Sequence, residues 1–514
     1  NKKILPCIFL LEFILKSRKL NFNFFLIVFL TCFSLKSQNE IDVVRYSMQT
    51  IGSTARSYGV AGAFGSIGAD ASCAGINPSG LARFRNSSLN LSASFYNAKN
   101  NASYIGQTLN DNKFNFNVPN LGLIVNLPAA DYNNKKPTGF VNFVFGFNVN
   151  RLNNYNMRSL FSANNKESSI TQDWAQRANS TNDIPINFSR YSLEHLAYQT
   201  WLLDKDTTSP TPAYNSAYGK NAALNVNQQG NILTKGALSD YNASFAGNYK
   251  HILLFGISLG AKSVRYVQSN SFKEKDNKPV GVKDIDYVVL DQYQRTNGIG
   301  LNAKFGVNIA PNEFIRIGYA YHSPTIFNLT DSYSYTITSK FDYQARDQFG
   351  DLRESSTATT DATVYKYKIS VPGRQVFSLG LVNKNLGFLS LDLESVNYSQ
   401  SYLYAKDYAF ADENLNIKKS MNPSVVNLRL GGELIQNQFR IRAGYARHPS
   451  TYREGAVPYV KSLVNNIYTL GMGIKEKRYA FDIAFVNSGY ANYFVPYTLS
   501  NGVSYAITNN VRTN

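Results

Sequence analysis

Hydrophobic and polar residues alternate with a period of two along most of the chain after residue 86. Between residues 140 and 150, Val141, Phe143, Phe145, Phe147 and Val149 alternate with residues that are mostly polar or small. A period of two places successive side chains on opposite faces of a β-strand. Each such run therefore predicts a strand with one apolar face.

Runs of this kind recur along the chain, and we predict 13 strands from them. They lie at 88–97, 114–127, 139–152, 239–249, 252–268, 297–310, 313–330, 363–383, 387–402, 423–435, 438–447, 465–475 and 478–492. The connections alternate between short turns, such as Lys250-His251 and Gln436-Asn437, and longer polar loops, above all 153–238. Short turns at one end and long loops at the other are typical of outer-membrane barrels, whose short turns face the periplasm.

The predicted fold is therefore an all-β, transmembrane antiparallel β-barrel. A bacterial single-chain barrel usually has an even number of strands, so we expect 14 strands although only 13 are readable. The thirteenth is followed by a polar stretch, Ser500 to Asn514. We therefore expect the closing strand to be missing.

Several positions interrupt or decorate the strand pattern. Pro119 and the run Val371-Pro372-Gly373 predict bulges or breaks, because proline cannot donate to a β-ladder. Tyrosines near predicted strand ends suggest an interfacial aromatic girdle, formed by Tyr96, Tyr249, Tyr266, Tyr398 and Tyr479.

Composition narrows the class of protein. Aromatic residues make up 14% of the 514 residues and charged residues 17%. No run of about 18 apolar residues follows residue 40, which argues against a helical membrane protein. The formal charge is +18, but the Lys and Arg residues are scattered singly, so we predict no nucleic-acid binding. Cys73 is the only cysteine after the leader, which excludes a disulfide framework within the chain.

The first 37 residues resemble a secretory leader. Lys16, Arg18 and Lys19 precede an apolar run from Phe24 to Leu30, and cleavage after Ser37 fits the pattern. We predict a signal peptide at 1–37, an N-terminal hatch (a plug inside the lumen) at 38–86 and the barrel at 87–514. Export through the Sec pathway to the outer membrane of a Gram-negative bacterium follows from this layout.

The hatch prediction rests on a stretch rich in Gly and Ala that does not alternate. Small residues permit close backbone approach, as a compact plug requires. The stretch carries a motif, formed by Gly59, Gly62, Asp70, Asn77, Pro78, Ser79 and Gly80. This motif resembles the hatch signature of the FadL/OmpP1/TodX family of outer-membrane transporters for hydrophobic compounds.

That resemblance implies a plugged 14-stranded barrel that passively transports small hydrophobic molecules, such as long-chain fatty acids. It also implies lateral exit into the bilayer at a kink in the third strand, for which Gly146 is the candidate. In the family, Gly-Gly-Ala-Phe and Asn-Pro-Ala-Gly-Leu are the usual forms, whereas this chain has Ala61 and Ser79 at two positions.

The long loop 153–238 contains a second candidate site. Four apolar side chains fall in or near a short predicted helix: Leu193, Leu196, Trp201 and Leu203. An exposed apolar helix in an extracellular loop would form a ligand-capture groove, whereas the same helix packed on neighbouring loops would form a small extracellular core. The sequence leaves both interpretations open.

We predict neither an enzyme nor a cofactor or metal site, because the four histidines fall in unrelated elements. Inward-facing charges such as Lys304, Glu394, Arg429 and Arg440 instead suggest paired networks in the lumen. The expected partners are a hydrophobic ligand, outer-membrane lipid and lipopolysaccharide, and the barrel-assembly machinery, with the protein acting as a monomer. The alternatives are a scaffold or secretion-machinery subunit with a sealed lumen, and a haemin receptor, for which His195 beside Tyr198 is the candidate.

Overall fold

The computed structural model describes residues 40–49, 51–130, 132–133, 137–180, 192–206, 213–218, 224–277, 285–346, 352–456, 464–500, 502 and 504–513. The predicted signal peptide at 1–37 lies outside these residues, as do the first two residues of the predicted hatch. The described residues belong to one compact unit, Glu40–Asn514. Within them, no helix is both long and apolar enough to cross a bilayer.

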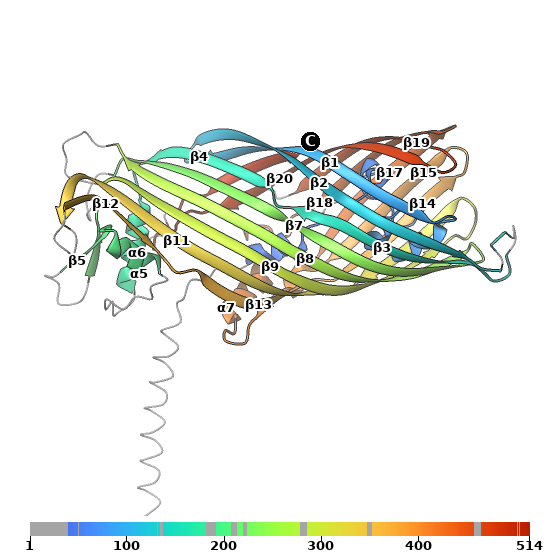
Figure 1. Ribbon diagram of the computed structural model, residues 1–514, viewed down its shortest axis with the longest axis horizontal. Coiled ribbons are helices and arrows are strands. Elements are labelled where there is room, and N and C mark those ends of the chain that lie inside the picture. Colours follow the sequence, from blue (N-terminus) through green and yellow to red (C-terminus); the bar gives the residue numbers. More distant parts are fainter. Residues whose placement is uncertain are drawn as a thin grey trace, which may run out of the picture. The chain divides into compact units, whose positions relative to one another are not determined.

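Most of the described chain forms one 19-stranded antiparallel sheet that closes into a barrel (Figure 1). Its strands are β1 (Ser88–Tyr104), β2 (Gln107–Pro128), β3 (Phe140–Asn154), β4 (Met157–Asn165), β7 (Val226–Tyr249), β8 (Leu253–Asp276), β9 (Ile285–Ile309), β10 (Ile315–His322), β11 (Thr325–Arg346), β12 (Leu352–Thr359), β13 (Thr363–Val371), β14 (Arg374–Asn383), β15 (Gly387–Val396), β16 (Tyr402–Tyr404), β17 (Val425–Gln436), β18 (Phe439–His448), β19 (Asn465–Lys475), β20 (Ala480–Phe494) and β21 (Ile507–Thr513).

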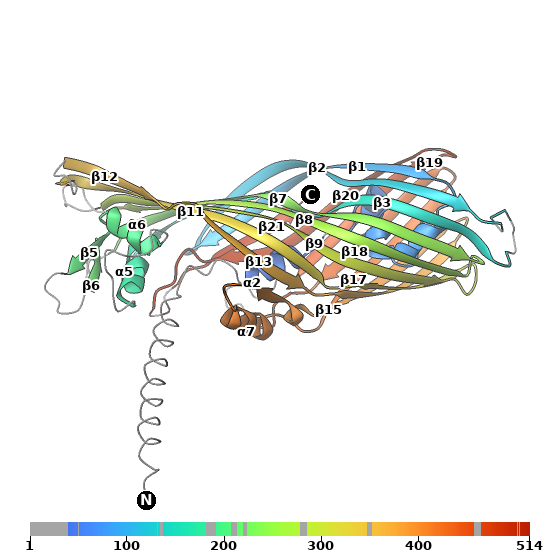
Figure 2. The same ribbon diagram turned by 60° about the horizontal axis from the view of Figure 1, so that its bottom comes forward.

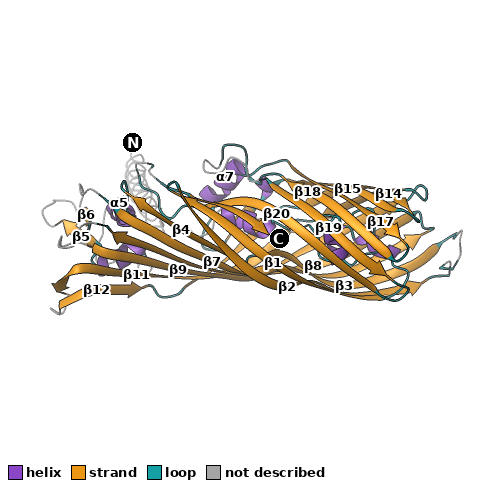
Figure 3. Cartoon of the chain, turned by 90° about the horizontal axis from the view of Figure 1, so that it is seen from above, coloured by secondary structure: helices purple, strands orange, loops and turns teal. Residues whose placement is uncertain are grey.

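The helices and a small second sheet accompany the barrel. They are α2 (Glu40–Ser47), α3 (Ala55–Gly59), α4 (Cys73–Ile76), η1 (Pro78–Arg83), α5 (Ile170–Ser180), α6 (Leu193–Gln199), η2 (Tyr398–Gln400), α7 (Ala411–Ser420), β5 (Leu203–Asp206) and β6 (Ala213–Ser216). In Figure 3, helical segments appear between and behind the strands of the barrel wall. The predicted all-β barrel with an N-terminal plug is confirmed.

The barrel has 14 strand positions, because several positions hold interrupted strands. Both β10 and β11 pair with β9, so together they form one position. The pairs β13/β14 and β15/β16 are interrupted in the same way. The break between β13 and β14 falls at the predicted Val371-Pro372-Gly373, and the β1–β2 register shifts opposite the predicted irregularity at Pro119.

The prediction of a missing closing strand is wrong. The fourteenth strand is β21, which pairs with β20 on one side and with β1 on the other. Its sequence alternates Ile507, Asn509 and Val511, which are buried, with polar residues. The apolar residues of β21 therefore face inward, and the apolar outer face that identified the other strands is absent here.

The prediction of a long polar loop at 153–238 also needs correction. This range begins with the end of β3 and with β4, and it ends with the outer part of β7, which starts at Val226. Strands β7, β8, β9, β11 and β12 project beyond most other strands at one end of the barrel (Figure 2). Their outward residues there are polar, for example Thr338 and Thr357, whose hydroxyl oxygens lie 3.1 Å apart. Without an apolar outer face, apolar and polar residues alternate only weakly along these segments. The sequence pattern therefore does not predict them as strands.

Side chains facing lipid give the rest of the barrel its alternation. On β3, Phe145 and Phe147 on the outward face are about half exposed, while Asn148 on the inward face is fully buried. The girdle prediction is wrong for Tyr266 and Tyr398, which point into the lumen and are 4% exposed.

Candidate functional site in the plugged lumen

The hatch is held together by its own polar side chains. The hydroxyl of Thr54 accepts a hydrogen bond from the backbone N–H of Ser57 at 3.1 Å, which caps α3. The same hydroxyl donates to Asp70 Oδ1 at 2.8 Å, and the backbone N–H of Ser72 donates to that oxygen at 2.9 Å. Asp70 of the predicted motif therefore joins α3 to the segment that leads into α4.

Two glycines of the motif fit close approaches. Gly62 has φ +72°, and a Cβ atom there would lie 1.5 Å from the carbonyl oxygen of Ile51. A Cβ atom on Gly59 would lie 3.2 Å from Gly471 of the barrel wall. Gly62 therefore serves the turn after α3, and Gly59 lets the helix approach β19.

Asn77 caps the helix η1 and ties two parts of the hatch together. Its side-chain oxygen accepts hydrogen bonds from the backbone N–H of Ser79 at 3.3 Å and from the Ser79 hydroxyl at 2.7 Å. Its amide nitrogen donates to the carbonyl oxygen of Gly65 at 2.7 Å. Pro78 follows at the first helical position, where its missing N–H costs nothing.

The barrel wall has a notch that receives this motif. Gly256 of β8 and Gly306 of β9 are direct register partners. A Cβ atom on Gly256 would lie 2.5 Å from the carbonyl carbon of Pro78, and one on Gly306 would lie 1.9 Å from Asn77 Oδ1. Side chains at these two wall positions would displace the hatch. This notch was not predicted from the sequence. The glycines on the inner face of the two strands could have indicated it, because a glycine within a strand often marks a close backbone approach.

A belt of polar residues crosses the lumen above the Asn77 motif. The clearest pairs are Lys304 Nζ with Asp240 at 2.7 Å, and Glu394 with Arg374 at 2.8 Å and with Arg429 at 2.7 Å. These five residues, together with Lys262 and His322, form what we call the polar belt. All are at least 90% buried. The prediction of paired inward charges is confirmed for Lys304, Glu394 and Arg429, whereas Asp240 and Arg374 were missed.

Arg440 does not belong to a lumen network. Its guanidinium donates to the backbone oxygens of Asn437 and Phe439 at the turn between β17 and β18, in an exposed position. The prediction of an inward role is wrong there, because Arg440 lies next to the turn and its long side chain folds back over it.

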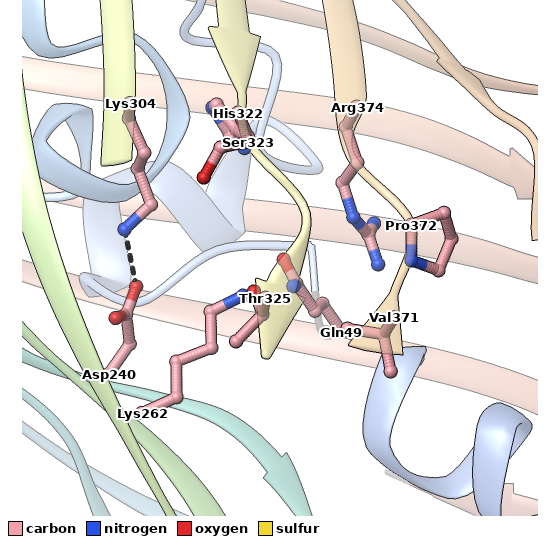
Figure 4. A pocket seen from close by; sticks show the side chains of 10 residues that line it. All are labelled: Gln49, Asp240, Lys262, Lys304, His322, Ser323, Thr325, Val371, Pro372 and Arg374. Carbon is pink, nitrogen blue, oxygen red and sulfur yellow. Dashed lines mark hydrogen bonds and ion pairs between the residues drawn. The ribbon is translucent and has the colours of Figure 1, made fainter. Parts of the chain in front are cut away.

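The belt also grips the hatch and encloses a small cavity. His322 Nε2 lies 2.9 Å from the carbonyl oxygen of Ile76, immediately before the Asn77 motif. The cavity has a volume of about 10 Å³ and is lined by polar groups from the belt together with Gln49 and Thr325 (Figure 4). Lys262 Nζ donates to Thr325 Oγ1 at 3.0 Å. A space of this size holds about one water molecule, so it is no pocket for an organic ligand.

The belt separates two apolar regions, as three strands show. On β7 the order is Leu238, Asp240, Ala246, and on β8 it is Val264, Lys262, Leu254. The first residue of each series belongs to an apolar cluster that we call the lumen cluster, and the last belongs to the core shared with the hatch. On β15, Val396, Glu394 and Phe388 repeat the order. An apolar path through the lumen is therefore interrupted at the belt, before the Asn77 motif.

Helix α2 occupies part of the lumen cluster. Val43 and Tyr46 are at most 1% exposed and pack among its aromatic side chains. The Arg45 guanidinium lies 4.2 Å from the centre of the Tyr266 ring, a cation–π contact. The hydroxyl of Tyr155 donates to the carbonyl oxygen of Arg45 at 3.0 Å. The segment before the motif is thus anchored above the belt.

The barrel wall has a seam next to the lumen cluster. β2 pairs with β3 only from Asn120–Asn150 down to Pro128–Asn142. Above this ladder, side chains connect β2 to the region of β4: Arg158 binds Asp111 at 2.6 and 2.7 Å, and Asn115 Nδ2 donates to the carbonyl oxygen of Asn156 at 3.4 Å. We call the stretch where residues 107–119 face residues 151–165 the seam.

The seam lies away from the predicted kink at Gly146. The ladders of β3 with both neighbours are regular at Gly146, whereas the β3–β7 register shifts between Phe140 and Asn142 at one end and between Arg151 and Asn153 at the other. A Cβ atom on Gly146 would lie 3.2 Å from Leu81 of the hatch. Gly146 therefore faces the hatch, and the irregularities of the described ladder lie near the two ends of β3, the outer one beside the seam. A role of Gly146 in exit stays a prediction.

The helix of the long loop packs into an apolar core. Leu193, Leu196 and Leu203 are at most 5% exposed and lie with Trp174 in a cluster that we call the outer core. Trp201 is partly buried against the same cluster. The interpretation as an exposed capture groove is therefore wrong for these side chains, which instead form the small extracellular core.

The residues considered for haemin binding lie on α6 of the long loop. His195 lies in the first turn of α6, and Tyr198 is 41% exposed and packs against the Tyr214 ring. Among the described residues, no three His, Cys, Asp or Glu side chains gather as a metal site would require.

These features define a plugged outer-membrane β-barrel. Its fold is that of a Pseudomonas aeruginosa FadL homologue, which aligns over 91% of this chain and 98% of its own with a TM-score of 0.50 and 12% identity. The Pseudomonas putida toluene transporter TodX aligns with 91% of this chain and 98% of its own at a TM-score of 0.46 and 10% identity. No family model matches the chain, and no curated protein matches it.

Proposed function

We propose that the protein is a passive outer-membrane channel for small hydrophobic molecules, such as long-chain fatty acids. The fold shared with the FadL homologue supports this proposal, as does the Asn77 motif. In the proposed route, an apolar solute enters from outside, reaches the lumen cluster and leaves sideways into the bilayer. The leader at 1–37 would direct export through the Sec pathway, and the barrel would act as a monomer.

The position of the seam supports the proposed sideways route of the solute. The lumen cluster is apolar, so it suits an apolar solute. The way down is closed by the charged belt, where an apolar solute would have to separate paired ions. The way sideways crosses no backbone ladder above the Asn120–Asn150 pair. Lateral exit through the seam is therefore the route of lower cost.

A reversible lock on the seam tests this route. Cysteines introduced by Asn115→Cys and Asn156→Cys would cross-link β2 to the start of β4, where the native side chain and backbone are in contact. Uptake of labelled fatty acid into proteoliposomes is measured before and after reduction. We expect the oxidised lock to reduce uptake about tenfold or more and reduction to restore it.

The control places the same lock in a closed part of the wall. Leu123→Cys and Phe147→Cys replace register partners in the regular β2–β3 ladder. Oxidation of this pair should leave uptake unchanged. Uptake that is insensitive to the seam lock would exclude lateral exit there, and an absence of uptake by the intact protein would overturn the transport function and favour a scaffold.

A further inference from the structure

Among the described residues, the first charge beyond the apolar outward surface of the barrel is basic on several strands. On six strands the first charged residue above the apolar outward run is Lys or Arg: Lys99, Lys235, Arg265, Arg295, Lys368 and Arg447. The opposite end is mixed, since Glu313 pairs with Lys384 at 2.6 Å and Glu476 is exposed beside Lys477. The outer edge of the apolar surface is therefore positively charged, whereas the inner edge carries charges of both signs.

The depth of these residues follows from β9. Its outward apolar residues run from Ile299 to Ile309, a span of 11 residues. At a tilt of about 40°, each residue rises about 2.5 Å, so the span is about 28 Å, close to the thickness of the hydrocarbon layer. Arg295 lies four residues further out, about 10 Å above that layer. A long side chain at this height reaches the polar headgroups.

The basic residues are densest on five neighbouring strands, β7, β8, β9, β11 and β13, which lie side by side in Figure 1. Arg265 pairs in register with Asn297, two residues from Arg295. Asn297 is opposite Thr330, which in turn is opposite Lys366. We call the resulting group the basic strip, formed by Lys235, Arg265, Arg295, Lys366 and Lys368.

The strip lacks internal counter-charges. All five side chains are exposed, and among the described residues none of them forms an ion pair. Cations in the lumen behave differently, since Lys304 and Arg442 are each paired with a carboxylate. Like charges on neighbouring strands repel one another, and anions that lie against the strip would relieve this repulsion.

We propose that the basic strip binds the phosphate groups of lipopolysaccharide in the outer leaflet. Phosphates are the anions that lie at the height of the strip, and Arg binds them through paired N–H donors. Lysines beside the arginines add charge without a fixed geometry. This inference is independent of the proposed function, because it depends on the outer face of the barrel and not on what the lumen carries.

The test compares two triple variants with the same loss of charge. The first, Arg265→Gln, Arg295→Gln and Lys366→Gln, removes the centre of the strip. The control, Lys384→Gln, Lys477→Gln and Arg478→Gln, removes three exposed cations at the inner end. Purified full-length proteins are titrated with phosphorylated lipid A and with enzymatically dephosphorylated lipid A, and binding is read by native mass spectrometry.

We expect the intact protein and the control to bind phosphorylated lipid A about tenfold or more tightly than the strip variant. Dephosphorylated lipid A should bind all three proteins equally weakly. Equal binding of phosphorylated lipid A by the strip variant and the control would overturn the proposal, as would equal binding of the two lipids by intact protein. Should the triple variant fail to assemble, Arg265→Gln alone replaces it, with Lys477→Gln as its control.

Discussion

Asn77 and Gly306 lie so close that the hatch and the wall cannot both keep their positions if a methyl group is added to the glycine. A Cβ atom on Gly306 would lie 1.9 Å from Asn77 Oδ1, and Gly256 next to it is equally confined by Pro78. The wall is thus shaped to receive the Asn77 motif, and the motif and its notch act as one unit.

The first prediction follows from this fit. Gly306→Ala should weaken hatch docking by about 1–3 kcal/mol, the usual cost of overpacking a well-filled site. Passive flux of apolar solutes or of small ions through planar bilayers should therefore rise. Gly489→Ala is the matched control, since its Cβ atom would meet nothing closer than 3.9 Å. Equal flux through both variants would show that the notch does not hold the hatch.

The second prediction uses Cys73 as a reporter of hatch opening. This thiol is fully buried, and burial raises its pKa well above the ordinary value, so it is both inaccessible and protonated. Maleimide labelling of the mature protein should be very slow. Asn77→Ala removes the two hydrogen bonds of the cap and the one to the Gly65 carbonyl oxygen, and it should speed labelling about tenfold or more. Asn90→Ala, on the wall strand β1, should leave the labelling rate unchanged.

The third prediction concerns the polar belt. Glu394 accepts hydrogen bonds from Arg374, Arg429 and Asn427 within 2.8 Å. Glu394→Gln leaves two buried guanidinium groups without their carboxylate, which should cost about 3–5 kcal/mol. The temperature at which the folded band disappears in semi-native electrophoresis should fall. Glu313→Gln breaks only an exposed, solvent-screened pair and should leave that temperature nearly unchanged, so an equal effect of the two changes would contradict a structural belt.

The fourth prediction is a pH dependence in the outer core. Glu274 accepts hydrogen bonds from the Ser169 hydroxyl, the Ile170 N–H and the Gln228 amide, and burial raises its pKa to about 7. The carboxyl therefore holds its proton longer in the folded loop than in the open loop. Local stability should be greatest below pH 4.5 and fall by about 3 kcal/mol as the pH rises through 7.

Hydrogen exchange measures this dependence at the Ile170 amide, after correction for the intrinsic exchange rate. Glu274→Gln keeps a neutral side chain at all pH values, so protection should become independent of pH between 5 and 8. A slope that persists in the variant would assign the effect to another group.

The sequence predicts the barrel well because lipid imposes a simple rule on it. Residues such as Phe145, Leu301 and Leu430 alternate with inward residues, and thirteen of the fourteen strand positions follow from that rule. The rule fails for β21, whose apolar residues point inward, and for the outer part of β9, where water replaces lipid. In both places the chain is strand, but the outward face has no reason to be apolar.

The site was less predictable, because its parts depend on pairing between distant segments. The hatch motif is local in sequence, and its residues could be named. Asp240 meets Lys304 across 64 residues, and Arg158 meets Asp111 across 47 residues. Nothing near Asp240 or Arg158 in the sequence distinguishes them from surface charges, so the belt and the seam became visible only in three dimensions.

The long strands have a consequence for the surroundings of the cell. β9 continues for 14 residues above Ile299, which carries the outer core about 35 Å above the hydrocarbon layer. That height exceeds the headgroup zone and enters the hydrated sugar layer that covers the bacterium. A molecule outside the cell could therefore touch this part of the barrel without entering the bilayer.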